Sequence, residues 1–356
     1  MKHWGKALAG VTITVLALWW ALAGVSFSEV WANIRLGNDW LLLASVAVAT
    51  FGFLLRAMRW RVLLTPVCPD TSLRSRFAGV SIGFMANNIL PARVGEFARA
   101  YALSRVEPVT ASAAFGTLVV ERFMDGVVLL LFLILPIFAP SFPSDSVLSS
   151  GTGSLILQAA IVAVVAVLLA LVVMAVWPRL FVRVAHSGAR FAPKSLAQPV
   201  LAGLDAFLQS IAIIRDPKLL ALGFAWTLLF WTWHGLAFWL GMLAFGIDTG
   251  FVSAIFTEAV VGFGVALPAA PGFFGTFHAS ASVALSDVYG VSEAQSLAFA
   301  FGFHFGGWVP ITLIGLWYAG RLGFSLGDVG GAEDRVGREV EEAAAGAGKA
   351  SISQQS

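Results

Sequence analysis

The sequence has very little charge and almost no cysteine. Of its 356 residues, 12% are Asp, Glu, Lys or Arg, whereas 58% are hydrophobic. Soluble domains carry about 25% charged residues, so the composition excludes an ordinary soluble enzyme. Cys68 is the only cysteine, which excludes an intramolecular disulfide and any CxxC metal or redox motif.

Motifs for metal and nucleotide chemistry are also missing. The five histidines are scattered and form no HExxH pair. The segment closest to a phosphate-binding loop, GARFAPKS at 188–195, has Pro193 where that loop requires glycine. We therefore expect no metal, no cofactor, no nucleic-acid partner and no ATP hydrolysis.

Long apolar runs dominate the chain instead. Several of them reach the ~20 residues needed to cross a hydrocarbon core of ~30 Å. These runs lie at 5–26, 39–58, 77–90, 111–139, 154–177, 217–245, 251–267, 273–288 and 294–320. The pattern predicts an all-α polytopic membrane protein.

The first run has two interpretations. Lys2 and Lys6 precede it, and the sequence 21–23 resembles a signal-peptidase site. The run is longer than a usual signal sequence and contains Trp19 and Trp20, which favours a retained first helix. Cleavage stays open as the alternative.

A helix-breaking phrase occurs twice, as LPARVGEF at 90–97 and as LPAAPGFF at 267–274. Proline removes a helical hydrogen bond but suits the first turn of a new helix. Each phrase therefore predicts the tip of a re-entrant hairpin, surrounded by protein or by a wet cavity. The residues expected at the tips are Pro91, Gly95, Pro268, Pro271, Gly272 and Gly275.

Basic residues predict how these elements are oriented. Arginine and lysine crowd three connections, at 56–76, at 178–218 and after 320, and are missing from 140–153, 246–250 and 289–293. Basic connections face the cytoplasm. All three can do so if the two hairpins enter the membrane from opposite faces. Both termini are then cytoplasmic, in the inner (cytoplasmic) membrane.

The resulting fold has about six spanning helices plus two oppositely oriented re-entrant hairpins. Opposed hairpins are the pattern of an inverted-topology repeat, here with halves at about 39–139 and 217–320. A helix at 154–177 and an interfacial amphipathic helix at 195–215 connect the halves. Residues 1–320 form the transmembrane domain, and 321–356 form a disordered cytoplasmic tail.

Charged residues interrupt the apolar pattern close to the first hairpin. Glu121, Arg122 and Asp125 lie ~15 Å along one predicted span, near the bilayer midplane, where each charge is costly. Arg93, Glu96 and Arg99 recur every three residues after Pro91. The six side chains would form a neutral cluster. It either locks the hairpin to the span or, beside a helix N-terminus, binds an anion.

The second half of the chain carries fewer such residues. Glu258 lies in the first leg of the second hairpin, His278 follows its tip, and His304 lies in the last span. In the repeat alignment His304 occupies the place of Arg122, where it could carry a titratable charge. A purely structural hydrogen bond for either histidine is the alternative.

Three segments carry a family resemblance: NNILPARVGEFARA at 87–100, VVERFMDG at 119–126 and LPAAPGFFGTFHA at 267–279. In sequence and order they resemble the lysylphosphatidylglycerol synthase transmembrane-domain family, also called flippase-like. The family is similar to the membrane half of bacterial multiple-peptide-resistance proteins, which move aminoacylated phosphatidylglycerol between leaflets. The resemblance implies a functional role for Asn88, Arg93, Glu96, Arg99, Glu121, Arg122, Asp125, Pro268, Pro271, Gly272 and Gly275.

The expected function is movement of a phosphate-bearing amphipathic lipid, of phospholipid or polyprenyl-phosphate type, between leaflets. No aminoacyltransferase domain follows residue 320, so we expect no lysylphosphatidylglycerol synthesis. A lipid-modifying enzyme within the membrane and a non-transporting scaffold are the alternatives. The expected partners are lipids with anionic headgroups, with a second copy of the chain or lipid-synthesising enzymes as further candidates.

Overall fold

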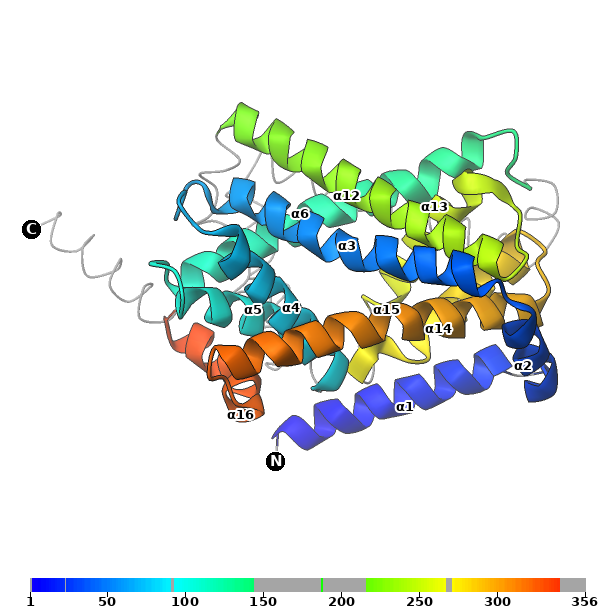
Figure 1. The fold of residues 1–356 in the computed structure, drawn as a ribbon, viewed down its shortest axis with the longest axis horizontal. Coiled ribbons are helices and arrows are strands. Elements are labelled where there is room, and N and C mark those ends of the chain that lie inside the picture. Colours follow the sequence, from blue (N-terminus) through cyan, green and yellow to red (C-terminus); the bar gives the residue numbers. More distant parts are fainter. Residues whose placement is uncertain are drawn as a thin grey trace, which may run out of the picture.

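The computed structural model describes residues 2–22, 24–90, 93–143, 216–266 and 271–339, and also Ser187. Within these ranges every regular element is helical. The long helices run side by side along the longest axis of the molecule (Figure 1). The all-helical class predicted from the sequence is therefore confirmed for the described chain.

Three long helices form the apolar frame. They are α3 (Asp39–Leu64), α12 (Pro217–Ala244) and α15 (Glu293–Arg321), and each is long and apolar enough to cross a membrane. Each begins at a polar cap, because the side chains of Asn38, Asp216 and Ser292 accept hydrogen bonds from first-turn amides. The helix α3 continues past its predicted end at residue 58.

The first predicted span is bent rather than straight. Helix α1 (Lys2–Leu22) ends four residues before the predicted limit of 26, and α2 (Phe27–Leu36) leaves it at 80°. Ser26 caps the new helix by accepting a hydrogen bond from the amide of Glu29. The pair has the length and composition of a fourth span only if both helices are counted as one.

Helix α6 (Ala111–Ile134) has 24 residues and carries the charged motif. Its length is sufficient for a span, at ~1.5 Å per residue. Its three charges lie at the middle of the helix, whereas α3, α12 and α15 each contain an apolar stretch of 18 residues with at most two charges. Pro136 converts the end of the predicted segment into a 3₁₀ turn, η2 (Leu135–Phe138).

Two groups of short helices fill the frame. The first is α4 (Leu73–Ile89) with α5 (Gly95–Ser104), which lie side by side in the left half of Figure 1. The second lies in the right half and contains α13 (Gly250–Gly264), η3 (Pro271–Phe273), α14 (Thr276–Ser282) and η4 (Val283–Val288). Each group breaks its helix at one copy of the repeated phrase.

Some predictions fall outside the described residues. They include the tip residues Pro91 and Pro268, the helix at 154–177 and the interfacial helix at 195–215. The predicted count of six spans therefore stays a prediction.

The prediction of a disordered tail from residue 321 is wrong for residues 321–339. This segment contains α16 (Leu326–Gly330) and a further helical stretch at 332–339. Val329 of α16 is buried, and so are Ala332 and Val336 of the stretch that follows; Val329 and Ala332 join the core of α4 and α5.

Polar contacts also hold this tail segment. Arg335 donates to the hydroxyl of Tyr101 on α5 and pairs with Asp328 at 2.8 Å. The Glu339 carboxylate accepts a hydrogen bond from the Ser112 amide, in the first turn of α6. Residues 340–356 lie outside the description.

Candidate functional site

Two buried carboxylates on α6 are joined to α3 by one arginine. Arg59 Nη2 lies 2.9 Å from Glu121 Oε1, and Arg59 Nη1 lies 2.5 Å from Asp125 Oδ1. The side chains of Arg59 and Glu121 are fully buried. Glu121 and Asp125 share a helical face because they are four residues apart, so one guanidinium reaches both.

The first hairpin supplies a second arginine. Arg99 on α5 binds Glu121 through two hydrogen bonds, of 2.7 Å from Nη1 and 3.0 Å from Nη2. Its guanidinium also lies 4.0 Å from the ring centre of Trp60. The structure thus brings Arg99 of α5 into contact with Glu121 of α6, two of the six residues of the predicted cluster.

Arg122 completes the contacts on the more open side of α6. Its Nη2 lies 2.6 Å from Glu121 Oε1 and 3.1 Å from Asp125 Oδ2, the predicted pairing three residues apart. Its side chain is 41% exposed, unlike the other charged groups here.

Arg56 is buried beside these groups without a hydrogen bond at its Nη1 atom. That atom lies 3.7 Å from both Glu121 Oε1 and Asp125 Oδ2, beyond hydrogen-bond distance. The guanidinium lies 4.0 Å from the ring centre of Phe230 and 5.1 Å from that of Phe84. Among the described residues, Arg56 Nη1 therefore has ion-pair contacts at 3.7 Å but no hydrogen-bond acceptor.

We name these six residues, Arg56, Arg59, Arg99, Glu121, Arg122 and Asp125, the arginine cluster. Four arginines and two carboxylates leave it a formal charge of +2. The predicted neutral cluster is thus corrected. Sequence analysis had counted Arg56 and Arg59 with the basic connection that follows α3, because the apolar run breaks at residue 58. Their spacing of three residues, continuing the helix, was the available signal.

Arg93 and Glu96 lie apart from the hydrogen bonds of the arginine cluster. Arg93, with a positive φ of 56°, donates to the carbonyl oxygen of Ala266 at 2.5 Å and lies over the ring of Phe273 at 5.1 Å. A cation is favourable at this carbonyl because it lies just past the C-terminus of α13. Arg93 therefore links the two copies of the repeated phrase, through residues at 90–97 and 266–274. The carboxylate of Glu96 instead faces Asn87 Nδ2, at 3.5 Å.

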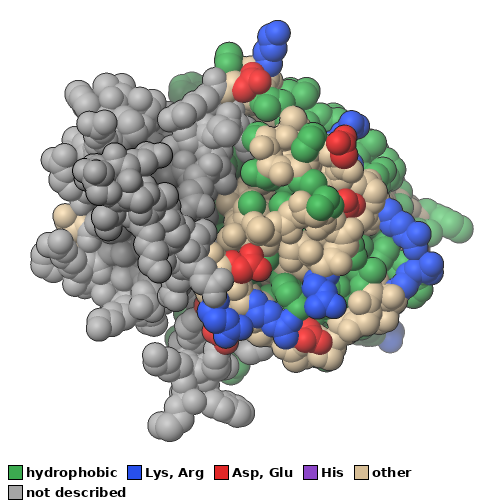
Figure 2. Space-filling model, turned by 90° about the vertical axis from the view of Figure 1, so that its left-hand side faces the viewer, with side chains coloured by type: hydrophobic (Ala, Val, Ile, Leu, Met, Phe, Trp, Pro, Cys, Tyr) green, Lys and Arg blue, Asp and Glu red, His purple; other side chains and the backbone are tan. Residues whose placement is uncertain are grey.

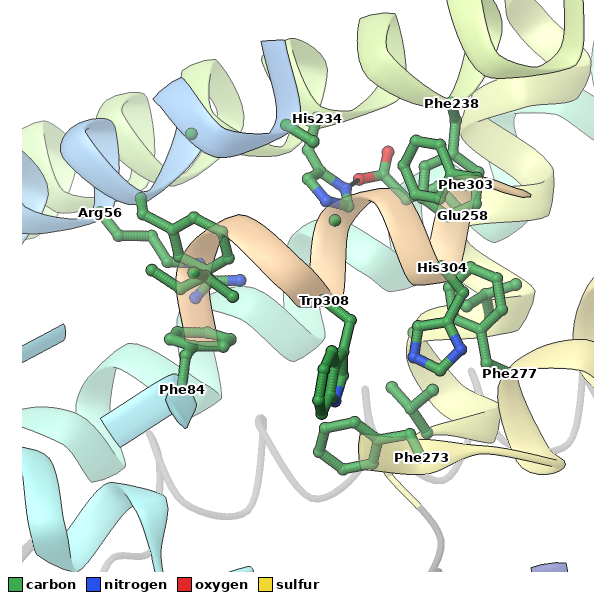
Figure 3. A pocket seen from close by; sticks show the side chains of 18 of the residues that line it. Arg56, Phe84, His234, Phe238, Glu258, Phe273, Phe277, Phe303, His304 and Trp308 are labelled. Atoms are coloured by element: carbon green, nitrogen blue, oxygen red, sulfur yellow. Dashed lines mark hydrogen bonds and ion pairs between the residues drawn. The ribbon is translucent and has the colours of Figure 1, made fainter. Parts of the chain in front are cut away.

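A cavity of about 200 Å³ lies between the arginine cluster and the second tip (Figure 3). Helices α3, α4, α12, α13, α14 and α15 contribute to it, together with η3. Aromatic rings form most of its wall, including Phe84, Phe230, Phe273, Phe277 and Phe303. The polar side chains that line it are Arg56, Asn88, His234, Glu258, His304 and Trp308. We call this the central cavity.

Several polar atoms in this lining have no partner among the described residues. They are Arg56 Nη1, Glu258 Oε2, His304 Nδ1 and Trp308 Nε1. A buried polar group without a hydrogen bond is costly. Four such atoms around one small cavity indicate a space built for a polar group.

Glu258 has one partner that sequence analysis missed. Its Oε1 atom lies 2.6 Å from Nδ1 of His234 on α12, and the pair faces the cavity (Figure 3). The two residues are far apart in sequence, so only the packing of α12 against α13 brings them together.

Of the remaining predicted residues, some line the central cavity and one lies outside its lining. Asn88 lines the cavity and donates to Thr312 Oγ1 on α15 at 2.8 Å. His304 lines it too, stacked 4.4 Å from the ring of Phe277. His278 lies outside the lining, where its Nδ1 faces the amide of Gly275 at 3.4 Å.

Glycine is required at the described tip positions. Gly95 packs so closely on α4 that an added β-carbon would overlap the carbonyl of Gly83 and the side chain of Asn87. Gly272 and Gly275 have φ values of 74° and 90°, which L-residues rarely adopt. Pro271 begins η3 directly before them.

Comparison with known proteins now identifies the family. The family model described as lysylphosphatidylglycerol synthase TM region matches residues 7–315. The chain belongs to this family. No solved structure matches the chain.

Curated relatives of this lysylphosphatidylglycerol synthase TM region are UPF0104 membrane proteins. That of Methanocaldococcus jannaschii is 32% identical over 28% of this chain, and that of Methanothermobacter thermautotrophicus is 27% identical over 35%. A third, from Pyrococcus horikoshii, is 28% identical over 38%. The chain spans 30%, 37% and 40% of these relatives' own lengths.

The family match and the apolar helices together make the chain an integral membrane protein. Within the described part of the chain, no group of three His, Cys, Asp or Glu side chains is placed to hold a metal ion.

Proposed function

We propose that the chain moves a phosphate-bearing amphipathic lipid between the leaflets of a membrane and acts on it without chemical conversion. The headgroup enters the central cavity, while the hydrocarbon chains stay in the bilayer. One observation carries the proposal: Arg56 extends a buried, unpartnered Nη1 into a cavity beside a cluster of formal charge +2.

An anion is the group that these features suit. A buried cation is unfavourable unless it is paired, and the two carboxylates of the cluster are already shared among four arginines. A guanidinium matches the geometry of phosphate oxygens and stays charged when buried. A bound phosphate would supply both the missing charge and the missing acceptor.

Movement across the bilayer is supported by the arrangement around the cavity. The two tips approach it from opposite halves of the molecule (Figure 1), and Arg93 joins them through Ala266. We propose that both groups of short helices are re-entrant hairpins related by an inverted repeat, with the substrate site where their tips meet. A headgroup could then reach the site from either side as one hairpin shifts.

The charges at the two ends favour the predicted orientation. One end carries the exposed basic residues Arg61, Arg74, Arg105, Lys218, Arg321 and Arg338. Figure 2 views this end and shows Lys and Arg side chains spread across it. The opposite end carries the exposed acidic residues Glu29, Asp39, Asp248, Asp287 and Glu293, together with Arg35. We propose that the basic end faces the cytoplasm and that both termini lie there.

The test is lipid exchange in liposomes that contain the purified protein. Fluorescent phosphatidylglycerol and a polyprenyl phosphate are offered as substrates, and dithionite quenching reports the outer leaflet. Arg56→Gln should slow exchange about tenfold or more, because a charged hydrogen bond contributes about 1.5–3 kcal/mol and 1.4 kcal/mol is a factor of ten.

The matched control is Arg61→Gln, which removes an exposed arginine from the same helix. It should exchange lipid as the wild type does. Chemical conversion of either lipid would instead favour an enzyme. Wild-type protein that neither moves nor converts any phosphate-bearing lipid would favour a scaffold.

A further inference from the structure

We propose that the His234–Glu258 pair takes up one proton when an anion occupies the central cavity, so that anion and proton cross the membrane together. The inference rests on the proposed function, since it assigns that function its coupling ion. Two observations support it: the geometry of the pair, and the contacts that bind the buried carboxylates Glu121 and Asp125 to arginines.

The pair is built as a proton site that faces the cavity. Glu258 is 1% exposed and its Oε1 lies 2.6 Å from His234 Nδ1. The second oxygen, Oε2, is buried without a partner. In the empty cavity a neutral His234 donates its Nδ1–H to Oε1, and Oε2 is free to form an O–H bond with an arriving proton.

The other membrane carboxylates are unsuited to this role. Glu121 contacts Arg59, Arg99 and Arg122, and Asp125 contacts Arg59 and Arg122, so ionisation of both is stabilised from several sides. Glu96 faces Asn87 outside the cavity lining. Glu258 is the carboxylate that lines the cavity without an arginine hydrogen bond among the described residues.

Repulsion between two anions in one small cavity is the reason that anion and proton should bind together. A phosphate held at Arg56 would bring a negative charge into the cavity that Glu258 also lines. A neighbouring like charge disfavours the ionised form of a carboxyl group. A proton transferred from cavity water to Oε2 removes that repulsion, and it returns to water when the anion leaves.

Other ionisable groups face the pair from the neighbouring helices. Arg56 approaches from α3, and Asp125 of α6 is separated from the cavity by Trp231, whose Nε1 it binds at 2.9 Å. His278 lies on α14, outside the lining, and His304 on α15 faces the cavity. His304 is therefore the competing proton acceptor, and the experiment includes its variant.

Proton movement is measured in liposomes that hold a pH-sensitive dye, with the membrane potential clamped. Phosphatidylglycerol added outside should acidify the lumen as it moves inward through wild-type protein. The quantity compared is the number of protons that enter per lipid moved. Glu258→Gln mimics the protonated side chain, so this ratio should fall to zero. Glu258→Asp should retain the ratio, and so should Glu293→Gln, which removes an exposed carboxyl group. His304→Gln should keep the ratio whatever its effect on the rate of exchange, and a ratio of zero in this variant would assign the proton to His304 and overturn the proposal.

A second measurement needs no lipid movement. Infrared difference spectra of detergent-solubilised wild type, recorded across pH 4–9, should show a carboxyl band that Glu258→Gln removes and Glu293→Gln leaves in place. Addition of short-chain phosphatidylglycerol to a weakly buffered sample should cause proton uptake by wild type and none by Glu258→Gln.

The two proposals fail in different ways. Lipid exchange by wild type without acidification would overturn the coupling and leave the transport function standing. A carboxyl band that never titrates, or one unaffected by Glu258→Gln, would also overturn the coupling. Wild type that takes up a proton with short-chain phosphatidylglycerol but moves no lipid would overturn the transport function and the joint crossing, and would leave only the proton site at Glu258 standing.

Discussion

At the scale of single residues, the four arginines of the arginine cluster have different tasks. Arg59 holds both carboxylates and also donates to Thr227 Oγ1 at 3.2 Å, so it joins α3, α6 and α12. Arg56 makes no such bond through Nη1 and faces the cavity. Burial and pairing thus separate a structural arginine from a ligand-binding one, although the two lie within one helical turn.

The division predicts unequal losses of stability. Arg59→Met would leave two buried carboxylates without their shared partner and should cost about 3–5 kcal/mol, the usual cost of breaking a buried ion pair from one side. Arg122→Met removes a side chain that is 41% exposed and should cost about 1 kcal/mol or less. Reversible denaturation of the purified proteins measures both changes. Equal losses in the free energy of unfolding would contradict this division, because they would show that Arg59 and Arg122 contribute equally to stability.

At the scale of helices, the sequence predicted the breaks better than the ends. LPARVGEF and LPAAPGFF both fall at helix interruptions, because proline and glycine act locally. The end of α3 was misjudged, because burial of Arg56 and Arg59 depends on carboxylates more than sixty residues away. His234 and Trp308 were missed for a related reason: an isolated polar residue in an apolar helix gives no local signal of what it will face.

The tail segment illustrates the same limit. Its composition is small and polar, which predicts disorder, yet Val329 and Ala332 are buried against the first hairpin. Hydrogen bonds from Ser325 lower the pKa of Asp328 to about 2, so this carboxylate stays charged as a partner for Arg335 at neutral pH. A few buried apolar residues on two short helical segments were enough to order this part of the tail once a complementary surface was present.

Larger side chains at the glycines of the two proposed hairpin tips should stop lipid exchange. At Gly95 a β-carbon would overlap α4, and at Gly272 it would lie 2.8 Å from Trp308 Nε1, with a φ that disfavours any side chain. Gly95→Leu and Gly272→Leu should therefore abolish lipid exchange while the proteins still insert into the membrane. The liposome assay and the yield in the membrane fraction measure the two effects separately.

A glycine in open space provides the control. Gly320 of α15 has no atom within 4 Å of an added β-carbon, so Gly320→Leu should exchange lipid at the wild-type rate. Full activity of Gly95→Leu and Gly272→Leu would place both tips away from the transport route.

At the scale of the whole molecule, the two sides of the central cavity differ in how many polar contacts hold them together. The arginine cluster binds α3, α5 and α6 together through several short contacts. On the other side of the cavity, α13, α14 and α15 contribute aromatic rings, His304 and Glu258, and the described hydrogen bonds there are few. The sequence predicted both sides as groups of residues. It could not predict the cavity, since that depends on how six helices and η3 pack.

If the two proposed hairpins enter the membrane from opposite faces, the side of the membrane on which each flanking connection lies can be predicted. The connections before α4 and after α5 should lie together on the cytoplasmic side, because the pair enters and leaves through one face. The connections before α13 and after η4 should lie together outside. In a Cys68→Ala background, four exposed positions report this arrangement: Asp70, Pro108, Asp248 and Glu293.

Membrane-impermeant maleimide applied to intact cells should label Asp248→Cys and Glu293→Cys. It should label Asp70→Cys and Pro108→Cys only after the cells are permeabilised, because the basic end of the molecule is retained in the cytoplasm. Labelling of Asp70→Cys and Pro108→Cys from opposite sides would mean that α4 and α5 together cross the bilayer. The central cavity would then lack the inverted symmetry that lets both leaflets reach one headgroup site, and the transport proposal would lose its route.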